Sequence, residues 1–353
     1  MEMGKRLTKE KIREVAYSLG LDLIGFANIE RFENAPVDMH PKSIFPEAKT
    51  VIVVGKRILR GGWRGIEEGT NWVSYTYFDY HGLLNSFFIQ LPLYELACFI
   101  EDYGYEAVPY YSGVPEAKPP GKPLRENQPP PDVHLAIRIA AVCAGLGEIG
   151  WSKVFLTKKY GPRQRLHAII TDLEVEPDPL VKPGSICKRC MECVKGCPSN
   201  AIPHIKEGKK VSIKIENYTY EWADIDLGKC TLSYHGGDSR VSPFIHKSFP
   251  GWNIDARKQN FSEEAAYKFC WSLSTGKWRK TEEFPSGYII EGHAYLQKWG
   301  VGGSYGICGS RGCMRSCFNF LEKAGIVEQR FKNEPFIRRK RWLLPYKVKR
   351  SKD

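Results

Sequence analysis

The chain has 353 residues, of which 42% are hydrophobic and 26% charged, and its formal net charge is +12. This length and composition exclude an intrinsically disordered chain and allow two domains, each with its own core. The N-terminus is a charged amphipathic segment without a hydrophobic signal region, and no uncharged apolar run of about 18 residues follows. The sequence therefore predicts a cytoplasmic protein without a membrane span.

The first half of the chain alternates helix-like and strand-like patterns. The predicted helices cover residues 9–19, 75–101 and 133–145, and the predicted strands cover residues 21–27, 51–55, 106–109, 154–157 and 166–173. We expect the last two strands to pair around a turn at Gly161-Pro162, and residues 116–131, which are rich in proline, to form a loop. This alternation predicts a layered α/β or α+β domain.

The run E-P-D-P-L-V-K-P-G at 176–184 has the composition of a linker, and the cysteine-rich half follows it. We therefore predict a first domain over residues 1–178, a second over 179–325 and a basic tail over 326–353. Beyond Gly208 the second domain is expected to be loop-rich. The sequence contains no Walker loop, Rossmann glycine triplet or H-E-x-x-H motif, so classical nucleotide and zinc-protease sites are excluded.

Four cysteines between Ile186 and Ile202 carry the strongest chemical signal. Cys187, Cys190, Cys193 and Cys197 have the spacing C-x2-C-x2-C-x3-C-P, which is typical of bacterial ferredoxins with 4Fe–4S clusters. In two-cluster ferredoxins the fourth cysteine of such a run binds the other cluster. Zinc is the alternative, because paired cysteines also bind zinc. The full spacing and the proline after the last cysteine favour iron–sulfur.

A partner motif is required downstream, and Cys308, Cys313 and Cys317 supply it. If Cys317 is the exchanged ligand, cluster one takes Cys187, Cys190, Cys193 and Cys317. Cluster two then takes Cys197, Cys308, Cys313 and one further cysteine, either Cys230 or Cys270. The second motif is irregular, because four residues separate its first two cysteines and Phe318 stands in the usual proline position.

The C-terminal tail concentrates positive charge. Residues 330–353 contain ten Lys or Arg against two acidic residues, with Phe, Trp and Tyr between them. Such a segment suits RNA or another acidic partner, and equally a solvated basic tail that lies on its own domain.

The stretch Ala141–Glu174, with A-G-L-G-E-I-G, Y-G-P-R-Q-R and T-D-L, followed by the cysteine run, resembles the corrinoid iron–sulfur reductases. These are the reductive dehalogenases and the related epoxyqueuosine reductases of tRNA modification. Glu148 and the 160–165 segment resemble the dehalogenases, and so does Gly251–Lys258, which points to Cys270 as the open ligand. Lys229–Tyr234 resembles the tRNA enzymes and points to Cys230. Cys270 is preferred, and Cys230 stays open.

The resemblance implies an α+β fold, with a nitroreductase-like α/β domain that binds cobalamin and a ferredoxin-like domain with two 4Fe–4S clusters. It implies that cobalamin is bound base-off, since the sequence lacks the D-x-H-x-x-G lower-ligand motif. The clusters would pass single electrons to the corrinoid. Gly145, Gly147, Ser152 and Lys153 are the corrin contacts that the resemblance implies.

The resemblance also implies a general acid near cobalt, a tyrosine in dehalogenases and an aspartate in the tRNA enzymes. At that place this sequence has Y-Y, so Tyr111 is the candidate and Tyr110 its neighbour. A phenol has a pKa of about 10, so it needs a nearby cation to stabilise the phenolate, and Arg163 or Arg165 is expected to supply one.

Three functions remain open from the sequence. The preferred one is a dehalogenase-like reductase of a small molecule, with a ferredoxin or flavodoxin as electron donor. The second is an epoxyqueuosine reductase acting on tRNA, which the basic tail favours and the tyrosine in place of aspartate disfavours. The third is a ferredoxin-like electron carrier without a corrinoid.

Overall fold

The computed structural model of the chain describes residues 7–79, 83–110, 121–245, 253–274, 306–309, 311–337 and 344. Tyr111 and most of the basic tail therefore lie outside the described residues.

A four-stranded antiparallel sheet forms the centre of the first half. Its strand order is β1 (Leu23–Asn28), β2 (Thr50–Arg57), β6 (Gln164–Thr171) and β3 (Ala107–Tyr110). The register sets Ile52 opposite both Phe26 and Ile169. The mixture of helix and sheet that the sequence predicts is confirmed, and each of these strands overlaps a predicted one.

The apolar run of β2 explains why it lies in the middle of the sheet. Val51 and Val53 belong to the core on one face, whereas Ile52 and Val54 belong to the core on the other. Successive side chains of a strand point to opposite faces, so a strand that is covered on both sides needs an unbroken apolar run.

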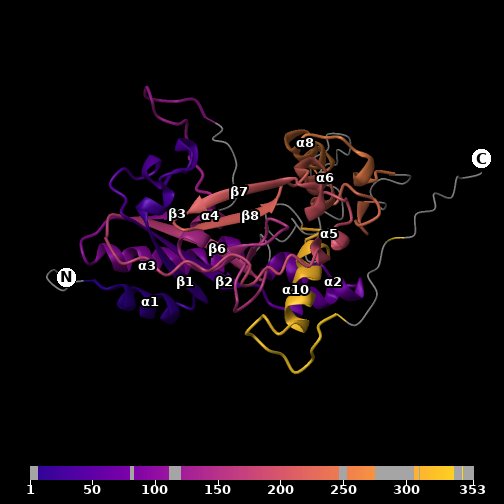
Figure 1. Cartoon of the computed structure of the whole chain (residues 1–353), viewed down its shortest axis with the longest axis horizontal. Helices are drawn as coiled ribbons and strands as arrows, with labels where there is room; N and C mark the ends of the chain where they lie inside the picture. Colours follow the sequence, from indigo (N-terminus) through magenta and orange to yellow (C-terminus); the bar gives the residue numbers. More distant parts are fainter. Residues whose placement is uncertain are drawn as a thin grey trace, which may run out of the picture.

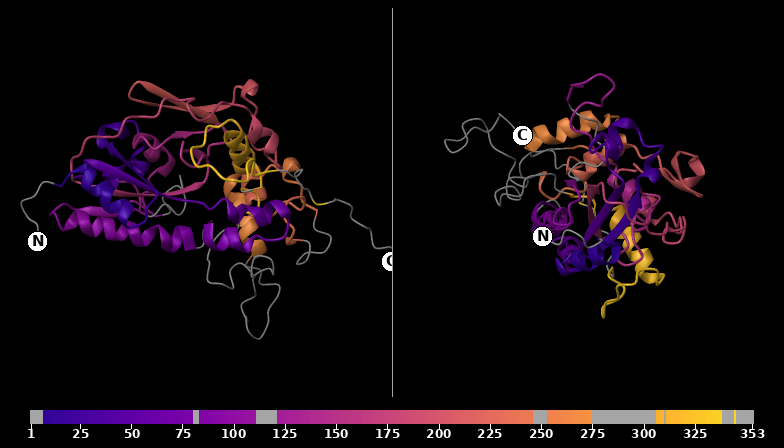
Figure 2. Two further views of the ribbon diagram at one scale, coloured as in Figure 1. Left: turned by 90° about the horizontal axis from the view of Figure 1, so that it is seen from below. Right: turned by 90° about the vertical axis from the view of Figure 1, so that its left-hand side faces the viewer.

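Helices cover both faces of the sheet. Helix α1 (Lys9–Ser18), capped by Thr8, and helix α3 (Gln90–Glu101) share one core with the sheet, and α4 (Ile137–Cys143) packs on the opposite face. The left-hand view of Figure 2 shows α3 running along one side of the strands.

The long helix predicted over residues 75–101 is interrupted. It contains two π-helical turns, η5 (Tyr75–Asp79) and η6 (Leu84–Phe88), before α3 begins. By length and composition alone the stretch Tyr75–Glu101 is a candidate to cross a membrane, a test that core helices of soluble proteins also pass. The absence of a membrane span stays a prediction.

The predicted pairing of residues 154–157 with 166–173 is wrong. Strand β5 (Phe155–Leu156) pairs instead with β4 (Glu148–Ile149), and β6 pairs with β2 and β3. The tight turn between β4 and β5 keeps them together, so β6 is free to enter the central sheet.

The segment beyond Gly208 is more regular than the sequence suggests. Strands β7 (Lys210–Ile215) and β8 (Tyr218–Ala223) form a hairpin, and α6 (Leu227–Tyr234) and α8 (Glu263–Ser274) follow. Together with α5 (Glu192–Gly196) and α10 (Cys313–Lys323), these helices gather on the right in Figure 1, beyond the central sheet. The remaining short elements are η1 (Ile29–Phe32), η2 (Val37–Met39), η3 (Pro41–Ser43), η4 (Gly61–Trp63), α2 (Arg64–Glu68), η7 (Ile205–Glu207) and η8 (Ala256–Lys258).

The proline-rich run at 176–184 is anchored to the sheet domain. Asp178 accepts two hydrogen bonds from Arg13, each of 2.9 Å, and one from Lys9 at 2.9 Å. The first residues of the tail are also packed, because Phe336 is buried and Arg60 lies over its ring at 5.1 Å. The run at 176–184 and the first residues of the tail are therefore packed against the rest of the molecule.

Candidate functional site

Four cysteines from distant parts of the sequence line one hollow. Cys187 and Cys190 come from the loop that leads into α5, Cys193 lies on α5 itself, and Cys317 comes from α10. The hollow encloses about 340 Å³, part of it open to solvent. Arg189 and Met191 lie between these cysteines with φ of 49° and 60°, so the loop turns sharply enough to direct its thiols inward.

The thiols around this hollow favour their protonated form, because burial and then neighbouring cysteines raise the pKa of Cys193 and Cys317. For Cys317 the neighbours are Cys187, Cys193 and Cys190, and then Cys313. Four thiolates at one place are stable only around positive charge, so the residues fit a metal cluster.

A second group of cysteines lies beside the first. Burial, followed by repulsion from Cys197, Cys313 and Cys230, raises the pKa of Cys308. The pKa of Cys230, on α6, is raised by burial and by Cys313 and Cys197. A Cβ on Gly312 would lie 2.8 Å from the sulfur of Cys308, so the backbone of this turn approaches the thiol closely. The structure thus brings Cys197, Cys230, Cys308 and Cys313 together.

Cys270 lies apart from both groups. It is buried in a small apolar cluster with Leu232, Ala256 and Ala266, and its sulfur is close to the backbone of Gly237. Burial raises its pKa to about 12, and none of the other cysteines contributes to that shift. Within the described residues, no three His, Cys, Asp or Glu side chains are arranged to bind a single metal ion. The two groups of cysteines are defined instead by the hollow that the first group lines and by the effect of the cysteines of the second group on one another's pKa.

Glu148 holds the start of the first cysteine loop. Its carboxylate is buried and accepts the backbone N–H groups of Gly184, Ile186 and Cys187 at 2.8, 2.5 and 2.9 Å. The backbone N–H of Trp151 points to the sulfur of Cys187 at 3.4 Å. The A-G-L-G-E-I-G-W segment therefore positions Cys187, a role that the spacing of its residues does not reveal.

The four residues expected to contact a corrin differ in what surrounds them in the structure. Gly145 has a φ of 69°, and a Cβ there would overlap the carbonyl oxygen of Pro179. A Cβ on Gly147 would overlap the backbone of β5. Both glycines therefore serve close backbone packing. Ser152 is buried and lines the cysteine hollow, and the carbonyl of Lys153 accepts a hydrogen bond from Arg138 at 2.8 Å.

The two candidate arginines lie on or beside β6, between the sheet and the second half. Arg163 is buried, donates to the carbonyl of Ile58 at 2.7 Å and to Gln329 at 2.5 Å, and lies over the ring of Phe318. Burial, with Arg60 nearby, lowers its pKa to about 10. Tyr110 is buried in the core, where burial raises its pKa and the nearby backbone of Leu135 opposes that shift. Tyr111 lies outside the described residues.

Arg165 has a tyrosine partner that the sequence did not single out. Tyr75, in the π-helical turn η5, is buried, and burial raises its pKa to about 12, a shift that the nearby charge of Arg165 opposes. Asp79 in the same turn accepts the N–H of Leu59 at 3.0 Å, and burial raises its pKa to about 6. π-Helical turns occur often at functional sites, but from the sequence this stretch looks like an ordinary apolar helix.

No family model matches the chain. Curated relatives do. Over 212 residues the chain is 31% identical to a tetrachloroethene reductive dehalogenase of Dehalobacter restrictus, a match that covers 56% of this chain and 35% of that enzyme. Over 250 residues it is 24% identical to an epoxyqueuosine reductase of Listeria monocytogenes, covering 61% of this chain and 58% of that enzyme. The chain thus spans about a third of the length of the dehalogenases it matches.

Two solved structures are similar at a lower level. A reductive dehalogenase described as B12-dependent has a TM-score of 0.46 and 20% identity, covering 77% of this chain and 35% of its own. An epoxyqueuosine reductase in complex with a tRNA stem loop has a TM-score of 0.45 and 16% identity, covering 90% and 82%. The kinship rests on the sequence relatives, and by them the chain is related to the reductive dehalogenases and the epoxyqueuosine reductases, which indicates an oxidoreductase.

Proposed function

We propose that this protein is a cobalamin- and iron–sulfur-dependent reductase that resembles the reductive dehalogenases and reduces a small molecule. The cysteines of this chain would hold two 4Fe–4S clusters, which would supply single electrons to a corrinoid bound base-off. The observation that carries the proposal is the hollow in which Cys317 of α10 joins Cys187, Cys190 and Cys193. This exchange of one ligand between two motifs is the arrangement of two-cluster ferredoxins.

The proposed cluster one takes Cys187, Cys190, Cys193 and Cys317. The proposed cluster two takes Cys197, Cys230, Cys308 and Cys313, because charge repulsion couples these four thiols. Cys270 lies in an apolar cluster, which favours Cys230 as the last ligand of cluster two. The Lys229–Tyr234 segment also points to Cys230.

The corrinoid is proposed to lie near Ser152 and Lys153, next to cluster one. Ser152 lines the hollow of the cysteines, so a group bound at this segment receives electrons over a short distance. A bound corrinoid supplies the redox chemistry at cobalt, and the protein supplies orientation, a proton and protection from water. Gly145 and Gly147 hold the turn that presents this segment.

Tyr111 is the proposed proton donor, with Arg165 or Arg163 as the cation that stabilises its phenolate. The charge of Arg165 close to the buried phenol of Tyr75 supports Tyr75 as a second candidate. The contact of Tyr110 with the backbone of Leu135 favours a packing role for that residue.

The proposed domains are residues 1–178 for the corrinoid and 179–325 for the clusters, with the basic tail after them, in a cytoplasmic protein. A ferredoxin or flavodoxin is the proposed electron donor. The alternative is reduction of epoxyqueuosine in tRNA, since the epoxyqueuosine reductase of Listeria monocytogenes matches 61% of this chain. A carrier without a corrinoid is the remaining alternative.

Anaerobic purification followed by iron, sulfide and corrinoid analysis tests the proposal. We expect about eight iron atoms per chain, from two clusters of four, and bound corrinoid with the electron paramagnetic resonance (EPR) spectrum of base-off cobalt. Clusters without corrinoid uptake would favour the electron carrier. Binding of tRNA that weakens steeply with salt, together with turnover of epoxyqueuosine, would favour the tRNA enzyme.

A further inference from the structure

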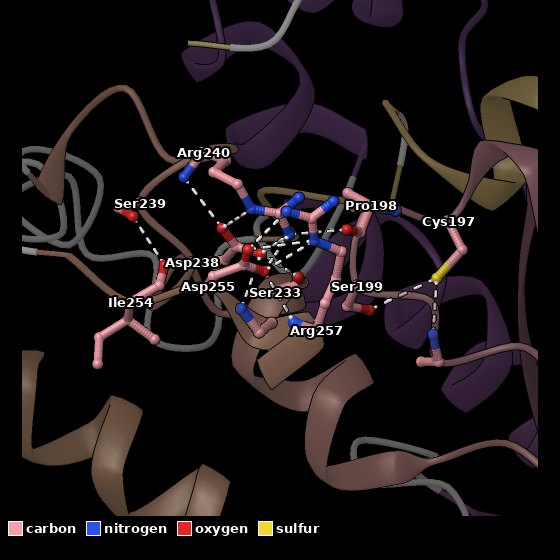
Figure 3. Close-up of polar contacts among 12 residues, drawn as sticks. Cys197, Pro198, Ser199, Ser233, Asp238, Ser239, Arg240, Ile254, Asp255 and Arg257 are labelled. Carbon is pink, nitrogen blue, oxygen red and sulfur yellow. Dashed lines mark hydrogen bonds and ion pairs between the residues drawn. The ribbon is translucent and has the colours of Figure 1, made fainter. Parts of the chain in front are cut away.

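A buried ion-pair network occupies the segment between the two cysteine motifs (Figure 3). Asp238 is fully buried, and its carboxylate accepts hydrogen bonds from the backbone and the guanidinium of Arg240, the shortest being 2.6 Å. Arg240 also pairs with Asp255 at 3.0 Å, and Asp255 pairs with the more exposed Arg257 at 2.6 Å. Two acids and two bases balance within the network.

The network reaches the loop of Cys197. Arg240 Nη2 donates a hydrogen bond of 2.8 Å to the carbonyl oxygen of Pro198, the residue after Cys197. The sulfur of Cys197 is itself close to the hydroxyl of Ser199 at 3.5 Å and to the N–H of Ala201 at 3.3 Å. Arg240 is therefore one residue away from a proposed cluster-two ligand.

The same network reaches the helix of Cys230. Ser233, on α6, donates to Asp238 at 3.2 Å, and Cys230 lies one helical turn earlier on α6. A second link joins the two ligand segments, since the N–H of Asp226, which caps α6, donates to the carbonyl of Ala201 at 2.9 Å. Asp238 thus contacts the helix of Cys230, and Arg240 contacts the loop of Cys197, so the pair links the two segments.

Burying charged side chains costs desolvation free energy, so stability alone does not explain this network. A buried ion pair is often no more stabilising than apolar residues of the same size, whereas it fixes geometry. The bidentate guanidinium of Arg240 fixes one direction toward Asp238 and another toward Pro198, which a lysine cannot do.

We infer that Asp238 and Arg240 are positioning residues for cluster two, which hold Cys197 and Cys230 at the separation that the cluster requires. The inference rests on the proposed cluster-two ligands. It gives the segment between the motifs a role in assembling the second cluster, and it predicts that the two clusters respond differently when the network is broken.

The test compares Arg240→Gln with a matched control, Arg257→Gln, in anaerobically purified full-length protein. Arg257 belongs to the same network, but among the described residues its side chain donates hydrogen bonds only to Asp255. We expect Arg240→Gln to retain about four of about eight iron atoms, with the EPR signal of cluster one kept and that of cluster two lost. Arg257→Gln should retain both clusters. Arg240→Lys should restore part of the second cluster, because it keeps the charge beside Asp238.

Ser233→Ala gives a milder readout if Arg240→Gln fails to fold. It removes one contact on the helix of Cys230, and we expect a shifted midpoint potential or EPR line shape for cluster two alone. Two intact, unshifted clusters in Arg240→Gln, or equal loss of both clusters in a folded variant, would overturn the inference. If the wild-type protein does not hold two clusters, the proposed function fails, and this result is distinct from the other two.

Discussion

The carboxylate of Glu148 accepts the backbone N–H of Cys187 at 2.9 Å. It accepts two further N–H groups of the same loop, so one buried anion orders the chain just before Cys187. A negative charge this close to a cluster favours its oxidised state, because reduction adds another electron beside the anion.

Glu148→Gln should therefore raise the midpoint potential of cluster one and destabilise its loop. An amide nitrogen replaces one of two accepting oxygens and leaves an N–H without a partner, at a cost of about 1–3 kcal/mol. An EPR-monitored redox titration measures the potential. Glu174→Gln is the control, since the side chain of Glu174 is 81% exposed. An unchanged potential and iron content in Glu148→Gln would show that the loop does not depend on this carboxylate.

Cys317→Ser should abolish cluster one and spare cluster two. Its sulfur lies in the hollow of Cys187, Cys190 and Cys193, far in sequence from them. Iron analysis should fall to about half of the wild-type content, with the EPR signal of cluster two preserved. Loss of cluster two with cluster one intact would show that the ligand is not exchanged between the motifs.

Cys230 and Cys270 form a matched pair for the second cluster. Cys230→Ser should lose cluster two, because Cys230 is grouped with Cys197 and Cys308. Cys270→Ser should keep both clusters and lose only a little stability from its apolar surroundings. Iron and sulfide counts on the two variants decide the question. The reverse pattern would restore Cys270 as the ligand.

The sequence reveals those parts of the fold and site that depend on local pattern. The cysteine spacing predicts that Cys187, Cys190 and Cys193 act together, and the structure has all three in one hollow. The apolar run of β2 identifies a central strand. The choice between Cys230 and Cys270 depends on how α6 and α8 pack, which local spacing does not encode. Arg240 and Asp238 likewise look like surface charges in the sequence and become a buried pair only after the chain folds. The pairing of β5 was missed because β4 has only two residues.

A buried ion pair links α10 to the first half of the chain. Arg315, between Cys313 and Cys317, donates two hydrogen bonds of 2.5 and 2.6 Å to Glu67 on α2, and both side chains are almost fully buried. Glu67→Gln leaves the guanidinium buried without its counter-charge, so we expect a loss of about 3–5 kcal/mol in the free energy of unfolding. Denaturant titration measures it.

The neighbouring pair Arg64–Glu68 on the same helix is the control. It is 3.9 Å long and partly exposed, so Glu68→Gln should change the free energy of unfolding by less than about 1 kcal/mol. The double variant Glu67→Gln/Arg315→Met should recover much of the loss, since it removes the buried charge. A loss in Glu67→Gln as small as in the control would mean that water reaches Arg315.

His167 should make the protein less stable in acid. It is fully buried on β6, and burial, with Arg165 nearby, lowers its pKa to about 4. An unfolded histidine has a pKa of about 6.5, so below that pH the unfolded chain binds the proton and the folded chain does not. Its contribution to stability is complete above pH 6.5 and is lost as the pH falls to 4, to the extent of about 3 kcal/mol.

Denaturant titrations between pH 7.5 and 4.5 should show a shallower decline in the free energy of unfolding for His167→Gln than for the wild-type protein. Asp79, whose raised pKa acts in the opposite direction, is present in both proteins and cancels in the difference. Equal declines in the two proteins would mean that His167 is protonated in the folded state.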